Sequence, residues 1–268
     1  MRAPTLRALG LLSAKWVGGD ASTVAEATGP VVRSLGQPRS SEAHRRATRE
    51  CLLALAAVEA MLEDGNAGRG AVRGDRTGLV YTTAAAYGPS NRDFIESSSS
   101  GIHFAYTAPA GVSAEVAIEF GITGPYAIFL GGPPATLRGI WQAGLWLDSE
   151  ECDRVLVLAV EIFDECADLY ARAPRLTGRP LVEAAGCLWL EPGRGTLVFE
   201  SRRGLGRRVR PPHREEGEMF GCAPLAAIDR WRRASARAPL ELEGVWRGER
   251  ARLVWTEGLT VARAGVAR

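Results

Sequence analysis

Cysteine and histidine are the residues in this chain best suited to act as nucleophile, base or metal ligand, and there are few of either. The cysteines stand at irregular spacing: Cys51, Cys152, Cys166, Cys187 and Cys222. No two of them have the spacing of a zinc site. An odd number of cysteines in a chain this long indicates buried thiols in a reducing compartment. The sequence therefore predicts no metal and no cofactor.

The histidines, His44, His103 and His213, are far apart in the sequence. No Ser-His-Asp arrangement and no phosphate-binding glycine loop stands out. The chemically reactive residues by themselves thus indicate no ready catalytic constellation.

The stretch from Gly124 to Leu137, GPYAIFLGGPPATL, predicts a strand, a tight glycine turn and a helix start. Tyr126 to Leu130 has the look of a buried strand. Pro133 or Pro134 can begin the helix because the amide hydrogens of a first turn have no partner within the helix. Gly131-Gly132 could hold an anion there, but a tight strand-to-helix turn needs glycine in any case.

Periodicity and turn residues predict the surrounding elements. Helices are predicted at Ser41 to Asp64 with Ser41 as N-cap and Gly65 as the end, at Arg92 to Glu96, at Ala110 to Phe120 closed by Gly121, from Pro133 beyond Trp146, and at about Ala223 to Ala234. Strands are predicted at Ala8 to Leu12, Arg76 to Thr83, Tyr126 to Leu130, Arg154 to Val160, Leu181 to Leu190 and Thr196 to Glu200, with a hairpin from Leu240 to Trp246 and Ala251 to Trp255.

Helices that alternate with strands at this spacing predict an α/β fold with a mainly parallel sheet and helices on its faces. The 268 residues suffice for one large domain. The character changes after Glu200, where residues 201–268 offer a loop, a helix and a hairpin. We therefore expect one compact domain, with 1–200 as an α/β unit and 201–268 as a reduced remainder.

The charge balance argues against a nucleic-acid-binding protein. The formal net charge is +2, and the arginines are interleaved with acids almost everywhere. The exception is Arg202 to Arg214, which is typical of a solvated loop but could face an anionic partner.

The N-terminus also fits a protein that stays in the cytoplasm. Arg2 and Arg7 precede the apolar run Ala8 to Leu12, but that run is too short for a signal peptide and is soon interrupted by Lys15. No apolar run approaches the roughly twenty residues that cross a bilayer. We expect a cytoplasmic protein without a membrane span.

Five segments in order resemble the β-ketoacyl synthase family of the thiolase fold. They are Thr77 to Val80, Gly88 to Glu96, Gly121 to Pro125, Arg154 to Glu161 and Glu183 to Glu191, and together they cover about residues 75–195. The resemblance rests on their order and spacing. It implies a thiolase-like layered sheet with helices, with a complete N-terminal half and a reduced C-terminal half.

The resemblance also implies where catalytic groups would stand. Family enzymes place a nucleophilic cysteine after the Gly-Pro strand, where the helix dipole favours the thiolate. Counted from Gly124-Pro125, that position is Pro133. Residues 217–223, GEMFGCA, resemble the segment of the family's second histidine, with Glu218 in its place. No counterpart of the first histidine's segment stands out, so we predict no catalytic residue and no condensing activity by the chain alone.

The leading hypothesis is a non-catalytic subunit that pairs with an active β-ketoacyl synthase, as chain-length-factor-type subunits of polyketide or aryl-polyene pathways do. On that analogy the interface strand is Tyr126, Ala127, Ile128, Phe129 and Leu130. Phe94, Phe104 and Tyr106 would lie near the partner's acyl tunnel, although aromatic side chains more often simply pack in a core.

Two other hypotheses remain open. The chain could be an enzyme of divergent acyl chemistry that uses Cys166, Cys187 or Cys222, although their surroundings are more typical of inert thiols. It could also be a scaffold whose Arg207 and Arg208 contact an acidic acyl carrier protein.

Overall fold

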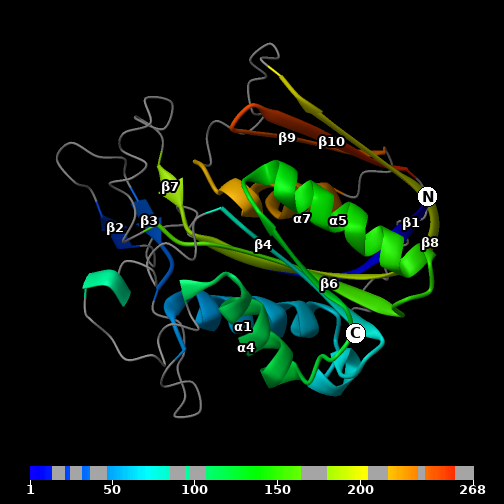
Figure 1. Cartoon of the computed structure of the whole chain (residues 1–268), viewed down its shortest axis with the longest axis horizontal. Coiled ribbons are helices and arrows are strands. Elements are labelled where there is room, and N and C mark those ends of the chain that lie inside the picture. The colour runs from blue at the N-terminus through cyan, green and yellow to red at the C-terminus, as the bar shows by residue number, and fades with distance from the viewer. Residues whose placement is uncertain are drawn as a thin grey trace.

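The computed structural model describes nine parts of the chain (Figure 1). They are residues 1–13, 22–24, 32–36, 47–84, 94–96, 107–163, 180–204, 217–234 and 239–256. The helices, strands and contacts of the fold are those of these nine parts.

The elements largely agree with the predicted pattern. The strands are β1 (Arg2–Ser13), β2 (Ser22–Val24), β3 (Val32–Ser34), β4 (Thr77–Thr83), β5 (Tyr126–Leu130), β6 (Arg154–Glu161), β7 (Leu181–Val182), β8 (Ala184–Arg203), β9 (Leu240–Trp246) and β10 (Glu249–Thr256). The helices are α1 (Arg49–Asp64), α4 (Ala110–Phe120), α5 (Pro133–Asp148) and α7 (Ala223–Arg233), with short 3-10 turns η2 (Arg69–Val72) and η4 (Phe220–Cys222).

The main sheet has seven strands in the order β5-β4-β6-β8-β10-β9, with β1 also paired to β8. Strand β4 is parallel to β5 and to β6, whereas β6–β8, β1–β8, β10–β8 and β10–β9 are antiparallel. The prediction of a mainly parallel sheet was therefore wrong. The parallel pairs are confined to β5, β4 and β6, and β8 runs antiparallel to β6. A small separate sheet joins β2, β3 and β7.

Strand β8 is one continuous strand of 20 residues, not the two shorter strands predicted. Its register with β1 shifts between the pairs Ala3↔Gly195 and Thr5↔Glu191, which leaves Pro192, Gly193 and Arg194 in a bulge opposite Pro4. A bulge bends a strand without ending it, and it accommodates proline and glycine. The Pro-Gly signal that suggests a break in the sequence is thus a bend.

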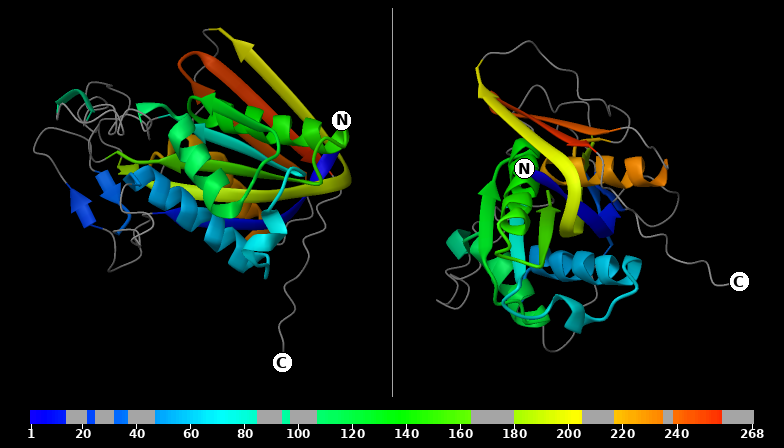
Figure 2. Two further views of the ribbon diagram at one scale, coloured as in Figure 1. Left: turned by 60° about the horizontal axis from the view of Figure 1, so that its bottom comes forward. Right: turned by 90° about the vertical axis from the view of Figure 1, so that its right-hand side faces the viewer.

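The bend lets one sheet cover α5 from two sides (Figures 1 and 2). The first half of β8 pairs with β6 and β1, and the second half pairs with β10. Helix α5 contacts β4 and β6 on one side and the β9–β10 hairpin on the other. Helices α1 and α4 pack on the opposite face of the main sheet (Figure 1). Each face of the sheet consequently has its own apolar cluster.

Local signals explain the helix boundaries. Glycine ends α4, where Gly121 has a left-handed φ of 64°. Gly65 ends α1, as predicted, but the N-cap of α1 is Thr48, so Ser41 is not its cap. The first residues of two predicted helices, 41–46 and 92–93, lie outside the described residues.

The predicted C-terminal helix and hairpin are present as α7, β9 and β10. Arg247 and Gly248 turn the hairpin with φ of 44° and 84°, as in a type I′ turn. Arg202 and Arg203, predicted to begin a loop, belong to β8 instead. Within the described part of the chain, no helix is long and apolar enough to cross a membrane.

Candidate functional site

Helix α5 begins directly after the turn that follows β5, at Pro133, one of the two prolines predicted to start it. Gly131 makes the turn possible with a φ of 147°, and its N–H donates to the Thr83 carbonyl at 2.8 Å. Pro133 and Pro134 have no amide hydrogen, and the Ala135 N–H donates to the Gly132 carbonyl at 2.9 Å. The first residues of α5 therefore present few free donors to an anion, despite the helix dipole.

Strand β9 covers this turn closely. A Cβ added to Gly132 would lie 2.5 Å from Cε3 of Trp246, and one added to Gly244 would lie 2.8 Å from the Pro133 Cβ. Side chains at either glycine would have to displace the opposing group. The surface of the turn on which a nucleophile would stand is thus packed against Gly244 and Trp246.

Three aromatic side chains continue this cover. The Phe220 ring lies 4.8 Å from Trp246 and 5.3 Å from Phe163, both edge to face. Phe163 and Phe220 are buried. Edge-to-face pairs are favourable and dense, so this aromatic cluster of Phe163, Phe220 and Trp246 fills the space beside the turn.

The segment around Glu218 lies next to α5. Thr136, one turn into α5, donates its hydroxyl to the Gly221 carbonyl at 2.6 Å. The Glu218 Oε1 accepts the Phe220 N–H at 3.2 Å, and the Glu218 backbone pairs with Leu181. The structure thus brings the segment and the helix together through Thr136 and Gly221. The hydrogen bond from the Phe220 N–H to the Glu218 carboxylate lies within the segment itself.

A residue that the sequence interpretation missed, Glu161, joins these pieces. It is fully buried at the end of β6, where its Oε1 accepts the Gly221 N–H at 2.9 Å and the Ala84 N–H at 2.8 Å. Its Oε2 accepts the Thr83 hydroxyl at 3.4 Å. An acidic residue directly after a continuous apolar strand was the available signal, because a buried carboxylate needs such donors.

Strand β5 differs from its prediction as a buried strand. It is an edge strand, and β4 is its one partner among the described strands. Tyr126 is 69% exposed and Leu130 is 55% exposed. Beside its end lies a shallow pocket of about 180 Å³ between Leu130, Arg138 and Trp246. The open edge and its exposed apolar side chains are features of an interaction surface.

Of the three aromatic residues also predicted for this interface, the structure describes Phe94. Phe94 lies half-buried in the helical turn at 94–96. Phe104 and Tyr106 lie outside the described residues, as do Arg207 and Arg208. The three histidines and Cys166 also lie outside them.

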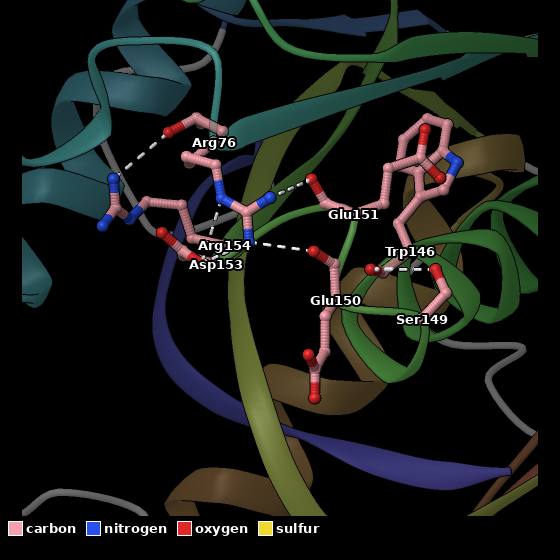
Figure 3. Close-up of polar contacts among 8 residues, drawn as sticks. Arg76, Trp146, Ser149, Glu150, Glu151, Asp153 and Arg154 are labelled. Atoms are coloured by element: carbon pink, nitrogen blue, oxygen red, sulfur yellow. Dashed lines mark hydrogen bonds and ion pairs between the residues drawn. The ribbon is translucent and has the colours of Figure 1, made fainter.

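The far end of α5 is fixed by a separate polar cluster (Figure 3). Arg76 donates to the carbonyls of Glu150 and Glu151 at 2.9 and 3.0 Å and to the Asp153 carboxylate at 2.8 Å. These bonds satisfy carbonyls just beyond the helix and hold the tight connection to β6, in which Glu150 has a positive φ of 59°. Arg76 therefore anchors α5 from the end opposite Pro133.

No protein-family model and no curated protein matches the sequence. Solved structures do match. The ishigamide ketosynthase/chain length factor superposes with a TM-score of 0.76 at 14% identity, over 94% of this chain and 99% of that one. A beta-ketoacyl synthase from Burkholderia phymatum gives 0.73 at 13% identity, over 96% and 100%. A third match is AntDE:AntF, a type II PKS acyl-carrier protein in complex with its ketosynthase bound to the hexaketide. It gives a TM-score of 0.73 at 11% identity, over 96% of this chain and 99% of that one.

The chain has the ketosynthase-like thiolase fold. At these identities the likeness establishes the fold and not the activity. It confirms the predicted fold and the resemblance on which that prediction rested.

The four thiols that the structure describes, Cys51, Cys152, Cys187 and Cys222, are poorly suited to nucleophilic attack. Burial raises the pKa of Cys187, and burial together with the nearby Glu161 charge raises the pKa of Cys222 well above its ordinary value. Cys222 also donates its hydrogen to the Ala184 carbonyl at 3.3 Å. Burial likewise raises the pKa of Cys51 to about 12 and the pKa of Cys152 to about 11. All four remain protonated near neutral pH, unlike an activated cysteine.

Among the described residues, no three His, Cys, Asp or Glu side chains lie close enough together to hold a metal ion. The site therefore consists of a closely packed turn, with proline at position 133, and beside it an exposed apolar edge strand, β5.

Proposed function

We propose that this chain is a non-catalytic ketosynthase-like subunit that pairs with an active β-ketoacyl synthase in the cytoplasm and shapes the synthase's acyl or polyketide tunnel. The observation that carries the proposal is the turn before α5. Its geometry is that of a helix start ready to present a nucleophile, yet it holds Pro133 and is packed against Trp246.

Catalysis by this chain is opposed by several independent features of that turn. Proline supplies neither a nucleophile nor an amide N–H for a developing oxyanion. The aromatic cluster occupies the space beside the turn, and the described cysteines are buried and protonated. Pro133 is on this proposal the lost nucleophile position, and Glu218 the lost histidine position. Residues 1–200 would be the ketosynthase-like half and residues 201–268 its reduced counterpart.

Pairing is supported by the edge of the sheet. Strand β5 offers backbone along one side that no described strand pairs, with Tyr126 and Leu130 exposed. An exposed apolar edge strand in a folded protein invites another strand. A synthase strand added at β5 would continue the sheet and place Phe94, Phe104 and Tyr106 toward the partner's tunnel. The likeness to a ketosynthase/chain length factor agrees with this arrangement.

Co-expression with a candidate β-ketoacyl synthase, sought among the neighbouring genes, tests the proposal. We expect the two chains to elute together as a 1:1 heterodimer, and we expect Phe104→Ala with Tyr106→Ala to alter the chain length of the synthase product without dissociating the pair. The matched control is Val245→Ala, an exposed residue on β9. If the chain purifies as a stable monomer and leaves product length unchanged, the proposal is wrong.

Contact with an acyl carrier protein is the second candidate, because a neighbour in fold is a carrier protein in complex with its ketosynthase. On this view Arg207 and Arg208 face the acidic carrier. Arg207→Glu with Arg208→Glu should weaken carrier binding, measured by calorimetry, while leaving the synthase pair intact. Unchanged carrier affinity would remove this candidate.

A further inference from the structure

The pocket at the end of β5 has the size of a single side chain. Its volume is about 180 Å³, and it lies between Leu130 of the exposed strand, Gly131 of the turn, Arg138 of α5, and Trp246 and Glu249 of the hairpin. Sites for cofactors and other small molecules are typically about 300–1,000 Å³, so this pocket is too small for one of them. One side chain with a few waters, at about 30 Å³ for each water, would fill it.

Two hydrogen-bond donors of this pocket have capacity to spare. Arg138 donates to the Glu249 carboxylate at 2.5 Å, and this ion pair is its one polar contact within the described part of the chain. The Arg138 side chain is still 40% exposed. The Trp246 indole N–H has no acceptor among the described residues, and its Nε1 lies 3.8 Å from the position of a Cβ added to Gly131. A guanidinium has five N–H donors and an indole has one, so the pocket favours a hydrogen-bond acceptor.

The charges at the pocket favour an anionic acceptor. Among the described residues that line it, Glu249 is the one acid, and its carboxylate also accepts the Ser201 hydroxyl at 2.8 Å. Arg138 lines the pocket, and the Arg247 guanidinium lies beside it, 5.6 Å from the centre of the Trp246 ring. Two arginines against one glutamate leave one positive charge without a counterpart here.

Elsewhere in this chain one guanidinium holds two carboxylates. Arg69 donates to Glu59 at 2.7 Å and to Glu119 at 2.5 Å. Arg138 holds one carboxylate, that of Glu249, and keeps N–H groups for a second. The planar fork of a guanidinium matches a carboxylate in geometry, so a second acid would bind Arg138 without displacing Glu249.

The pocket lies beside the strand on which the proposed pairing depends. Ile128, Phe129 and Leu130 of β5 line it, and β4 is the one described strand that pairs with β5. A strand added on the open side of β5 would lie about 4.8 Å away. The residue that flanks such a strand at its Leu130 end would therefore come to lie at the mouth of the pocket.

We propose that the pocket binds one aspartate or glutamate side chain of the synthase subunit, carried by the residue that flanks its paired strand at the Leu130 end. This inference rests on the proposed pairing through β5. Arg138 and the Trp246 N–H bind the carboxylate and thereby fix the register of the two strands, because a slip of one residue would turn the acid to the other face of the sheet. A synthase without an acid at that position leaves these donors without an acceptor and is disfavoured.

The affinity of the heterodimer tests the pocket. Arg138→Gln with Glu249→Gln removes both charges of the ion pair, so that neither is left alone, and takes the positive charge from the pocket. We expect the heterodimer to weaken at least about tenfold at low salt, measured by analytical ultracentrifugation, while the melting temperature of the isolated chain changes by less than about 3 °C. The matched control is Arg252→Gln with Glu241→Gln, an exposed ion pair of the same hairpin, which should weaken the heterodimer less than about twofold.

A chemical cross-link identifies the occupant. Arg138→Lys with Glu249→Gln places a primary amine in the pocket and removes the acid of the same chain that the amine could reach. A carbodiimide activates a carboxylate and joins it to an amine in direct contact as an amide, with release of a urea. Lys15 is the one lysine of the parent sequence, so few other amines compete. We expect mass mapping of the treated heterodimer to show a dominant cross-link from position 138 to an acid that flanks the synthase's paired strand.

The outcomes separate this inference from the pairing itself. Equal weakening by the pocket variant and the control, no weakening by either, or no cross-link from position 138 would overturn the inference and leave the pairing intact. If Glu249→Gln alone weakens the heterodimer and Arg138→Gln alone does not, the occupant is a basic side chain and the inference is wrong. A parent chain that forms no heterodimer would overturn the proposed function and this inference with it.

Discussion

The two sides of the turn before α5 meet their surroundings in opposite ways. On one side Trp246, Phe220 and Gly244 pack against the turn, and Glu161 secures the segment that carries Phe220. On the other side β5 ends the sheet with Tyr126 and Leu130 exposed. The side of the turn at Gly132 and Pro133 is therefore packed against the rest of the chain, and we call it the sealed side. The β5 side is exposed, and we call it the open side.

The two strands at the ends of the main sheet's order, β5 and β9, sharpen this difference. Strand β9 alternates apolar residues with Glu241 and Glu243, and charged side chains are a common protection of an edge. Strand β5 has the sequence YAIFL and carries no charge at all. This difference between the two strands supports the proposed pairing through β5.

The largest effect should come from breaking the sealed side. Trp246→Ala removes the ring that contacts Gly132 and Phe220. We expect a loss of about 3 kcal/mol in the free energy of unfolding, because truncation of a packed tryptophan leaves a cavity. Urea unfolding monitored by circular dichroism measures it. Val245→Ala, on the same strand but exposed, should change the free energy of unfolding by less than about 0.5 kcal/mol. An equal loss in both variants would mean that the packing of Trp246 does not stabilise the turn.

The open side should respond in affinity and not in stability. Tyr126→Lys with Leu130→Lys places two charges on β5, and we expect the heterodimer to weaken at least about 100-fold, or about 2.7 kcal/mol. The isolated variant should unfold within about 1 kcal/mol of the parent, since both side chains are already exposed. Analytical ultracentrifugation measures the first quantity and thermal melting the second. Val245→Lys on β9 is the matched control, and a similar loss from it would contradict the distinction between the edges.

The elements of both sides could be predicted from the sequence because their signals are local. Proline at 133 begins α5, Gly121 ends α4, and the hairpin turn is set by Arg247-Gly248. The likeness in fold was also within reach, because the order and spacing of short segments survive where identity is low.

The arrangement of these elements depends on distant segments meeting, which periodicity does not encode. Glu161 and Gly221 are 60 residues apart, and neither has a pattern that announces the other. The bent course of β8 results from the bulge at Pro192-Gly193, which in sequence is indistinguishable from a turn. The exposure of β5 was missed for the same reason, since an apolar run reads alike at the centre and at the edge of a sheet.

Glu161 should stabilise the fold through the hydrogen bonds that its carboxylate accepts and not through the size of its side chain. Glu161→Gln keeps one oxygen for the Gly221 and Ala84 amides but loses the charge that strengthens these bonds. We expect a loss of about 1–2 kcal/mol in the free energy of unfolding. Glu161→Ala leaves both amides without this acceptor and should cost clearly more. The comparison by denaturant titration fails if alanine and glutamine are equally tolerated, because the carboxylate would then not secure the sealed side.

The smallest effect concerns the anchor of α7, the helix directly after the sealed segment. Burial alone would raise the pKa of Asp64, but hydrogen bonds from Arg232 and from the Leu9 amide, with the Arg232 charge, hold it below its ordinary value. A carboxyl with a lowered pKa in the folded state stabilises above its unfolded pKa of about 3.9, and this contribution is lost as the pH falls through the folded value. Asp64→Asn should therefore cost about 0.5–1 kcal/mol at pH 7 and flatten the decline of stability below about pH 4. Melting curves from pH 7 to pH 3 measure both, and an unchanged acid limb in the variant would show that Asp64 does not couple α1 to the sealed side.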